Sequence, residues 1–305
     1  TPEAIRGLLD HAARLFDCSG AEETTLEANP DDLTAEYLDG LLEAGIDRLS
    51  IGVQSFDDDC LKLMNRRHTA AQAAEAVRAA QRAGFGNLTV DLIFGVPGFG
   101  GDTLRRSLDA ALSLGVQHIS AYHLTVEPDT AFGRRAARGE FRAVEEEVSE
   151  EEFLTVHQTL TAAGFEHYEV SNYALPGFRA RHNASYWHGT KYLGIGPAAH
   201  SFDGEERHWN ASSVEKYIAG APAGKEVLTQ RDRFNEYVMT ALRTAEGIDL
   251  EEAAARFGAK RLARMQEEAA PFLRSGTLRI DRGRMGLPPE KFLVSDAVIG
   301  ALFET

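Results

Sequence analysis

The residue types best suited to chemistry gather in residues 179–201, which read RARHNASYWHGTKYLGIGPAAHS. The segment holds three histidines (His182, His188 and His200), two tyrosines and a tryptophan, and then becomes small and apolar. Histidine is the commonest metal ligand, and aromatic rings pack well against a planar macrocycle. One interpretation is a loop that presents His182 to a metal-centred aromatic cofactor such as haem. The other is a polar connection followed by a glycine-rich buried strand, whose histidines only form hydrogen bonds.

The composition excludes several classes of protein. A formal net charge of -15 argues against nucleic acid as a partner, because a phosphate-backbone binder needs clustered Lys and Arg. No apolar run reaches the roughly 18 residues that span a bilayer. The two cysteines, Cys18 and Cys60, form no CxxC pair, which is typical of a reducing cytoplasm. The start at Thr1-Pro2-Glu3, without an initiator Met, suggests a piece of a longer chain.

Strands and helices that alternate along the first half must position any site. Apolar runs at 23–28, 46–56, 87–94 and 117–126 alternate with amphipathic helical segments. Such a pattern is typical of a parallel sheet covered by helices. No GxGxxG motif follows a strand, so a β/α barrel is favoured over a dinucleotide-binding fold.

Barrel chemistry sits at the carboxyl ends of the strands. The residues expected there are Glu27, Asn29, Gln54, Ser55, Asp91, the Gly95–Pro97 turn and Glu127. A carboxylate within the apolar run Val90–Ile93 is expensive to bury unless it is hydrogen bonded, so we predict a functional role for Asp91. For Gln54 and Glu127 the alternative stays open that strand ends are polar because they meet solvent.

The remainder of the chain predicts an extension and a separate C-terminal domain. The acidic run 140–152 is interpreted as a solvated linker or lid, and Ser149 with Glu152 as the capping box of a helix that ends at Ala163. A strand is expected at 165–173. A winged-helix-like domain is indicated by expected helices at 231–244, 249–257 and 259–275 and a short strand at 277–280. We interpret it as a cover or docking domain. We therefore predict three parts: 1–140, 141–228 and 229–305.

Six motifs in order resemble those of radical-SAM proteins related to oxygen-independent coproporphyrinogen III oxidase. They are Glu27-Ala-Asn-Pro30, Gly52-Val-Gln-Ser-Phe56, Asn65-Arg-Arg-His68, Asp91-Leu-Ile-Phe-Gly-Val-Pro97, Ala121-Tyr-His-Leu-Thr-Val-Glu-Pro128 and His182-Asn-Ala-Ser-Tyr-Trp187. The last resembles the HNxxYW haem-binding signature of HemW-type haem chaperones. The segment Tyr192–Ser201 and the C-terminal stretch Phe292–Ile299 resemble later blocks of that family.

The resemblance implies a fold, cofactors and site residues. The fold is a (β/α)6 radical-SAM barrel, of which four of the six strands are expected here, with a C-terminal α+β, winged-helix-like domain. S-adenosylmethionine would lie on Glu27, Gln54, Arg66 and Asp91, above a floor shaped by Gly95 and Pro97. Haem would lie on His182, Asn183, Tyr186 and Trp187, with His182 as the ligand of the iron.

One departure from the family is large. The family holds a [4Fe–4S] cluster through a CxxxCxxC motif, and the spacing of Cys18 and Cys60 does not match it. We therefore expect no cluster and no radical chemistry in this chain alone, and we predict no catalytic residues.

The resemblance implies a haem chaperone that delivers haem to apo-haemoproteins in the cytoplasm. Membrane-associated partner proteins and a homodimer are further partners that it allows. The alternative is an enzyme, oxygen-independent coproporphyrinogen III oxidase, which decarboxylates two propionate side chains in haem biosynthesis. The HNxxYW block favours the chaperone.

Overall fold

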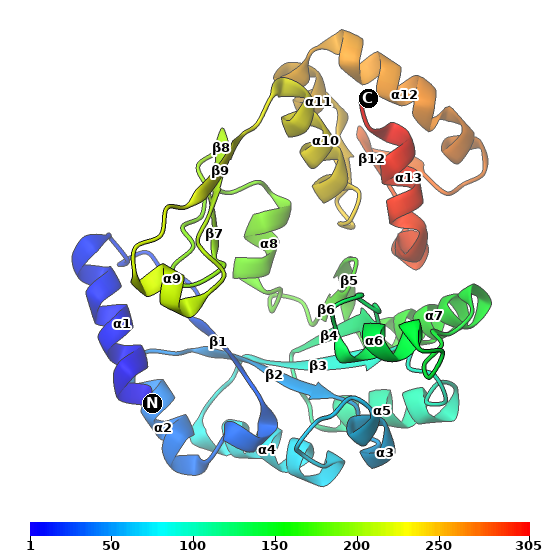
Figure 1. Cartoon of the computed structure of the whole chain (residues 1–305). Helices are drawn as coiled ribbons and strands as arrows, with labels where there is room; N and C mark the ends of the chain where they lie inside the picture. Colours follow the sequence, from blue (N-terminus) through cyan, green and yellow to red (C-terminus); the bar gives the residue numbers. More distant parts are fainter. The chain divides into compact units, whose positions relative to one another are not determined.

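The computed structural model describes residues 1–305, which divide into two compact units, Thr1–His182 and Asn183–Thr305 (Figure 1). This division is coarser than the predicted three parts, which remain a prediction. No helix of the chain is both long enough and apolar enough to cross a bilayer.

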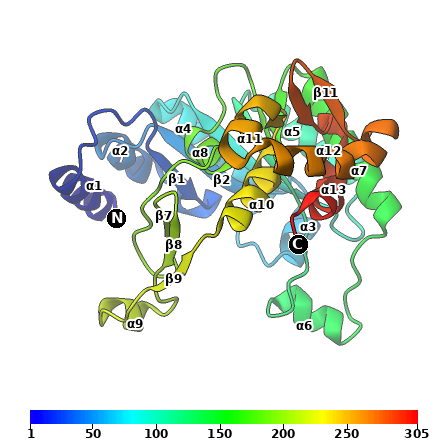
Figure 2. The same ribbon diagram turned by 90° about the horizontal axis from the view of Figure 1, so that it is seen from above.

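The first unit alternates strands with helices. Its elements are α1 (Pro2–Leu15), β1 (Thr25–Ala28), η1 (Pro30–Asp32), α2 (Ala35–Glu43), β2 (Arg48–Gln54), α3 (Asp58–Leu63), α4 (Ala70–Ala83), β3 (Leu88–Phe94), α5 (Asp102–Ser113), β4 (His118–His123), α6 (Ala131–Ala137), α7 (Glu146–Ala162), β5 (Glu166–Glu169) and β6 (Asn172–Ala174); α8 (Arg181–Trp187) spans the boundary. Seen from above, α6 stands clear of the sheet (Figure 2).

These strands form one sheet in the order β1-β2-β3-β4-β6-β5. The first four are parallel, which confirms the predicted strands and their covering helices. The expected single strand at 165–173 is instead a hairpin, in which β6 pairs antiparallel with both β4 and β5. A turn at Val170-Ser171 divides it, a change that alternating polarity alone does not reveal.

Helix α2 begins after Thr34, whose hydroxyl accepts from the backbone N–H of Tyr37. The predicted capping box at Ser149 is wrong. Ser149 lies inside α7, where its hydroxyl donates to the carbonyl of Glu145, and so it caps nothing. The acidic run is therefore not only a solvated linker, because its second half forms the first turns of α7.

The two faces of the sheet differ in polarity. Apolar side chains such as Leu49, Val90 and Ile119 alternate with polar ones and are fully buried. Helices α2, α4 and α5 lie along one side of the sheet (Figure 1). The alternate positions hold Arg48, Ser50, Thr89, Asp91, His118 and Ser120. A polar face of this kind can bind a ligand, whereas an apolar face needs helices to cover it.

The second unit contains two small antiparallel sheets and a group of helices. Its elements are β7 (His200–Phe202), β8 (Glu206–Trp209), α9 (Val214–Ile218), β9 (Gly224–Val227), α10 (Gln230–Ala241), β10 (Ile248–Asp249), α11 (Leu250–Phe257), α12 (Ala259–Arg274), β11 (Arg279–Asp281), β12 (Arg284–Gly286), η2 (Pro289–Val294) and α13 (Ser295–Leu302). The sheets have the orders β7-β8-β9 and β10-β12-β11. The second sheet with α10 to α12 gives the expected winged-helix-like arrangement.

Both interpretations of residues 179–201 need correction. Residues 181–187 form helix α8 rather than a loop, and no buried strand follows it. Leu193 and Ile195 are 60% and 58% exposed. Backbone segments approach each other closely at Gly194, where a Cβ atom would lie 2.0 Å from the carbonyl oxygen of His200.

The central strand β2 supplies a test of the core. Leu49 is fully buried, whereas Leu8 on α1 is 57% exposed. Leu49→Ala is expected to lower the free energy of unfolding by about 2–5 kcal/mol, because it removes buried methyl groups and leaves a cavity. Leu8→Ala, the matched control, is expected to change it by about 0.5 kcal/mol or less. Urea denaturation followed by circular dichroism measures both, and equal effects would contradict this core.

Candidate functional site

Asp91 lies at the centre of a row of polar side chains that crosses the sheet. The hydroxyl of Ser50 on β2 donates to both carboxylate oxygens of Asp91, at 3.1 and 3.2 Å. Ser120 is its register partner on β4, and the Ser120 hydroxyl also lowers the pKa of Asp91. Glu27 on β1 is the register partner of Ser50 and interacts electrostatically with Asp91. Two predicted site residues, Glu27 and Asp91, therefore belong to one row.

The environment of Asp91 opposes its negative charge. Burial raises its pKa to about 6, and the nearby Glu27 carboxylate adds to this, while the two serine hydroxyls work in the opposite direction. Tyr122 on β4 is 40% exposed, and burial together with Asp91 raises its pKa to about 12. A carboxylate poised near neutral pH in a polar row is typical of a binding or catalytic site.

Gln54 and Arg66 both lie near Asn29 at the carboxyl ends of β1 and β2. The guanidinium of Arg66 donates to Asn29 Oδ1 at 3.5 Å. A Cβ atom on Gly52 would lie 2.7 Å from Gln54 Nε2 and 3.9 Å from Asn29 Oδ1, so the side chains of Gln54 and Asn29 both lie over Gly52. Gln54 has φ of 68°, a left-handed conformation that is uncommon for a non-glycine residue. Such outliers cluster at functional sites.

The residues on either side of Arg66 fix its position. Asn65, with φ of 56°, turns the chain after α3, and left-handed backbone is tolerated well by asparagine. Arg67 forms an ion pair with Asp31 at 2.6 Å. The buried His68 ring hydrogen bonds to the carbonyl of Val53 at 3.0 Å. The two residues that follow Arg66, Arg67 and His68, therefore anchor the Asn-Arg-Arg-His motif to neighbouring parts of the fold.

Gly95 and Pro97 follow β3 in a turn that α7 holds. The N–H of Gly95 donates to Glu152 Oε2 at 2.7 Å, and Gly95 has φ of 73°. Its missing side chain leaves room for His123, whose ring nitrogen would lie 2.5 Å from a Cβ atom there. Burial raises the pKa of Glu152. The predicted lid residue Glu152 is thus a buried support for this turn.

The polar row continues to the other edge of the sheet. Asn172 on β6 is the register partner of Ser120 on one side and of Glu169 on β5 on the other. Glu169 is 1% exposed, its Oε1 has no hydrogen-bond partner, and burial raises its pKa to about 7. The row therefore runs from Glu27 to Glu169.

Helix α8, which carries the HNxxYW motif, is held at its N-terminus by Glu23. The backbone N–H groups of Arg181 and His182 donate to the two carboxylate oxygens of Glu23, at 3.0 and 3.2 Å. A carboxylate here satisfies unpaired N–H groups and complements the helix dipole. The N–H of Ala180 donates to the Tyr168 hydroxyl, which also hydrogen bonds to His118 of β4.

This anchoring leaves the imidazole of His182 exposed. Tyr186, one helical turn further on, is 40% exposed. The centroid of its ring lies 4.7 Å from the centroid of the Tyr192 ring, in an edge-to-face contact. Asn183 and Trp187 of the same helix are partly exposed. The residues of α8 can thus offer an imidazole and an aromatic ring on the same face, at i and i+4.

Comparisons with known proteins give this geometry a context. Residues 1–111 match the radical SAM superfamily, and residues 228–294 match the HemN C-terminal domain. The chain is 38% identical to the haem chaperone HemW of Mycobacterium tuberculosis, over 98% of this chain and 76% of that protein. The HemW of Lactococcus lactis is 32% identical, over 97% and 79%.

The chain belongs to the HemW family of haem chaperones. The crystal structure of coproporphyrinogen III oxidase from Escherichia coli superposes with a TM-score of 0.77 over 92% of this chain and 69% of that one. At 20% identity, this likeness shows the shared fold alone.

HemW proteins are members of the radical-SAM superfamily, which uses S-adenosylmethionine and a [4Fe–4S] cluster. The polar row, Gln54 and Arg66 fit S-adenosylmethionine, because they offer carboxylate, amide and guanidinium groups. The two cysteines of these 305 residues do not fit a cluster, since Cys18 is exposed and Cys60 is buried in α3. No three His, Cys, Asp or Glu side chains lie together as a metal site either.

Reasoning from the sequence missed several residues of this candidate site. They are Glu23, Ser50, Ser120, Tyr122, Glu169 and Asn172. The sequence pattern could have predicted two of them, since Ser50 and Ser120 interrupt apolar strands as Asp91 does. No sequence pattern could have predicted the role of Glu23, because its partners lie 158 and 159 residues away in the chain.

The raised pKa of Asp91 predicts how stability depends on pH. The folded state holds the Asp91 proton up to about pH 6. An unfolded Asp loses it near pH 3.9, so folding binds a proton between these values. Its contribution to stability is therefore full below about pH 4 and is lost as pH rises through 6. Asp91→Asn should exceed the wild type in unfolding free energy at pH 8 by at most about 3 kcal/mol.

Urea denaturation at pH 4 and pH 8 measures this difference, which should shrink toward zero at pH 4. The surface variant Asp39→Asn serves as the control, because that side chain is exposed. An Asp91→Asn variant that is less stable than the wild type at pH 8 would show that the charged carboxylate stabilises the fold.

Proposed function

We propose that this chain binds haem through His182 and transfers it to apo-haemoproteins. The observation that carries the proposal is the exposed imidazole of His182 at the start of α8, a helix fixed by both oxygens of Glu23. An axial ligand must keep its ring at a defined position while the face of the haem stays accessible. The hydrogen bond from its backbone N–H to Glu23 fixes the start of the helix that carries the ring, and the exposure of His182 leaves room for the haem.

The neighbours of His182 suit a flat macrocycle. Tyr186 lies one turn away on the same helix face and can cover part of the porphyrin ring. Trp187 and Asn183 complete the motif, with an aromatic ring and an amide that can donate to a propionate. An open site of this kind suits a carrier, which must release haem as well as hold it.

The proposal extends to partners and location. Apo-haemoproteins would receive haem from the exposed side of α8, and membrane-associated partners or a second copy of the chain would dock elsewhere. The charge of -15 supports protein rather than nucleic-acid partners. Both cysteines are free, which supports a reducing compartment such as the cytoplasm.

We also propose that the polar row binds S-adenosylmethionine. Arg66 would pair with the methionine carboxylate, and Glu27, Gln54 and Asp91 would contact the amino group and the ribose hydroxyls. Gly95 and Pro97 would shape the floor through the turn that Glu152 holds. No step of the haem-carrier function is assigned to a cluster.

A haem titration tests the role of His182. His182→Ala is expected to weaken the binding of ferric haem at least about tenfold and to shift the Soret band, because the axial nitrogen is lost. His188→Ala is the matched control, since His188 is also exposed and lies six positions further on. Absorbance at the Soret maximum, with one-to-one stoichiometry in the wild type, is the measurement. Unchanged spectra for His182→Ala would show that another group ligates the iron.

A second titration tests the proposed S-adenosylmethionine site. Arg66→Met should reduce binding about tenfold, because a charged hydrogen bond to the methionine carboxylate is lost. Arg78→Met should leave it unchanged, since Arg78 is an exposed residue of α4 that lies outside the proposed site. Equilibrium dialysis with labelled S-adenosylmethionine measures both. Equal losses in the two variants would contradict the assignment of Arg66.

A further inference from the structure

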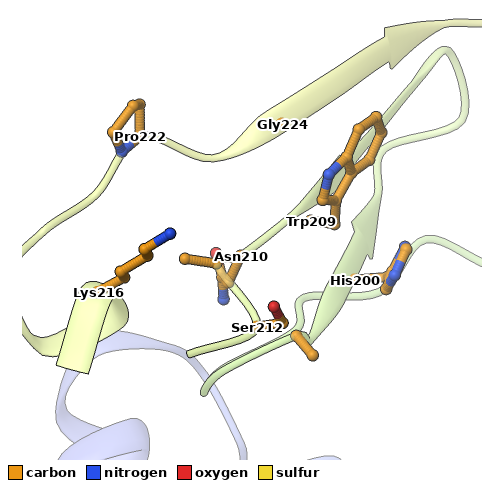
Figure 3. A pocket seen from close by; sticks show the side chains of 9 residues that line it. His200, Trp209, Asn210, Ser212, Lys216, Pro222 and Gly224 are labelled. Carbon is orange, nitrogen blue, oxygen red and sulfur yellow. The ribbon is translucent and has the colours of Figure 1, made fainter. Parts of the chain in front are cut away.

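A cavity of about 390 Å³ lies within the second unit, against the sheet β7-β8-β9 and helix α9 (Figure 3). Its lining includes His200, Trp209, Asn210, Ser212, Lys216 and Gly224. The volume falls in the range of small-molecule pockets, roughly 300–1,000 Å³. None of these residues belongs to the HNxxYW motif or to the polar row.

One wall of the cavity is a flat aromatic surface. His200, Trp209 and Gly224 are register partners across the three strands. The imidazole of His200 stacks on the indole of Trp209, with 6.1 Å between centroids and 29° between planes. A Cβ atom on Gly224 would lie 2.2 Å from the indole, so the ring rests on glycine backbone. The indole is 38% exposed, and its position is therefore fixed from behind while its surface remains accessible.

The opposite wall carries a cation without a partner. Lys216 projects from α9 toward the cavity (Figure 3) and forms no ion pair in the structure. Lys225 on the neighbouring strand differs, because its ammonium lies 3.7 Å from Glu206. The Ser212 hydroxyl also lines the cavity and has no hydrogen-bond partner. In a chain with a net charge of -15, an unpaired ammonium facing an indole is suited to an anionic, flat ligand.

The amide of Asn210 has a different role. Its Nδ2 donates to the carbonyls of Gly194 and Gly196, at 3.3 and 2.9 Å. It thereby holds the glycine-rich segment against the sheet and shapes the cavity. The groups left for a ligand are one aromatic face, one ammonium and one hydroxyl.

We propose that this cavity binds the carboxylate-bearing edge of a flat aromatic ring, for this chain the propionate edge of a porphyrin. The indole of Trp209 stacks on the ring, and Lys216 and Ser212 hold the carboxylate. The inference rests on the proposed haem-binding function, but it needs no iron and no contribution from His182.

The two tryptophans of the chain allow a selective test, because Trp187→Phe leaves Trp209 as the single indole. Metal-free protoporphyrin IX should quench the fluorescence of this variant saturably. In the same background, Lys216→Met should weaken binding about fivefold, and Lys225→Met should not change it. The dimethyl ester of the porphyrin, which lacks the negative charges, should bind as weakly as the acid binds to the Lys216→Met variant.

Failure of this inference can be told apart from failure of the proposed function. Quenching that does not saturate, or equal affinities for the acid and the ester, would overturn the cavity as a porphyrin site. So would equal losses in the two lysine variants. Adding His182→Ala should leave the quenching by metal-free porphyrin unchanged, whereas it should change the Soret band of ferric haem. Loss of quenching in His182→Ala with normal binding by Lys216→Met would overturn this inference and leave the haem site intact.

Discussion

The parallel register of β1 to β4 is the constraint on which the rest of the first unit depends. It aligns Glu27 with Ser50 and Asp91 with Ser120, so that polar side chains from strands far apart in sequence form one row. A slip of one residue in β3 would turn Asp91 toward the apolar face and Val90 or Leu92 toward the polar one. The apolar side chains that the helices cover therefore also determine where the carboxylate lies.

Burying that polar row has an energetic cost, and the cost differs between Asp91 and Glu169. Serine hydroxyls compensate part of the cost at Asp91, yet burial still raises its pKa to about 6. Glu169, at the far end, keeps an oxygen with no partner and has a pKa of about 7. Stability alone would favour apolar residues at both positions. Their presence is explained better by ligand binding than by folding, which agrees with membership of the radical-SAM superfamily.

The HNxxYW helix, α8, is positioned by contacts at its N-terminus and not by strand register. Its N-terminus is fixed by Glu23 and by the hydroxyl of Tyr168, so the first unit sets the position of His182. The remainder of the segment leads into the sheet β7-β8-β9, whose exposed indole and unpaired lysine form a second ring-binding surface by our proposal.

The sequence by itself determined the four parallel strands, the helices that cover them, the winged C-terminal region and the family, because hydrophobic periodicity and ordered motifs are local. It also singled out Asp91, since a carboxylate in an apolar strand is visible without a structure. The hairpin at 166–174 and the position of helix α8 at residues 181–187 were decided by tertiary contacts. So were the roles of Glu23 and Glu152, whose partners lie 158 and 57 residues away, because pairing over such distances leaves no periodic trace in the chain.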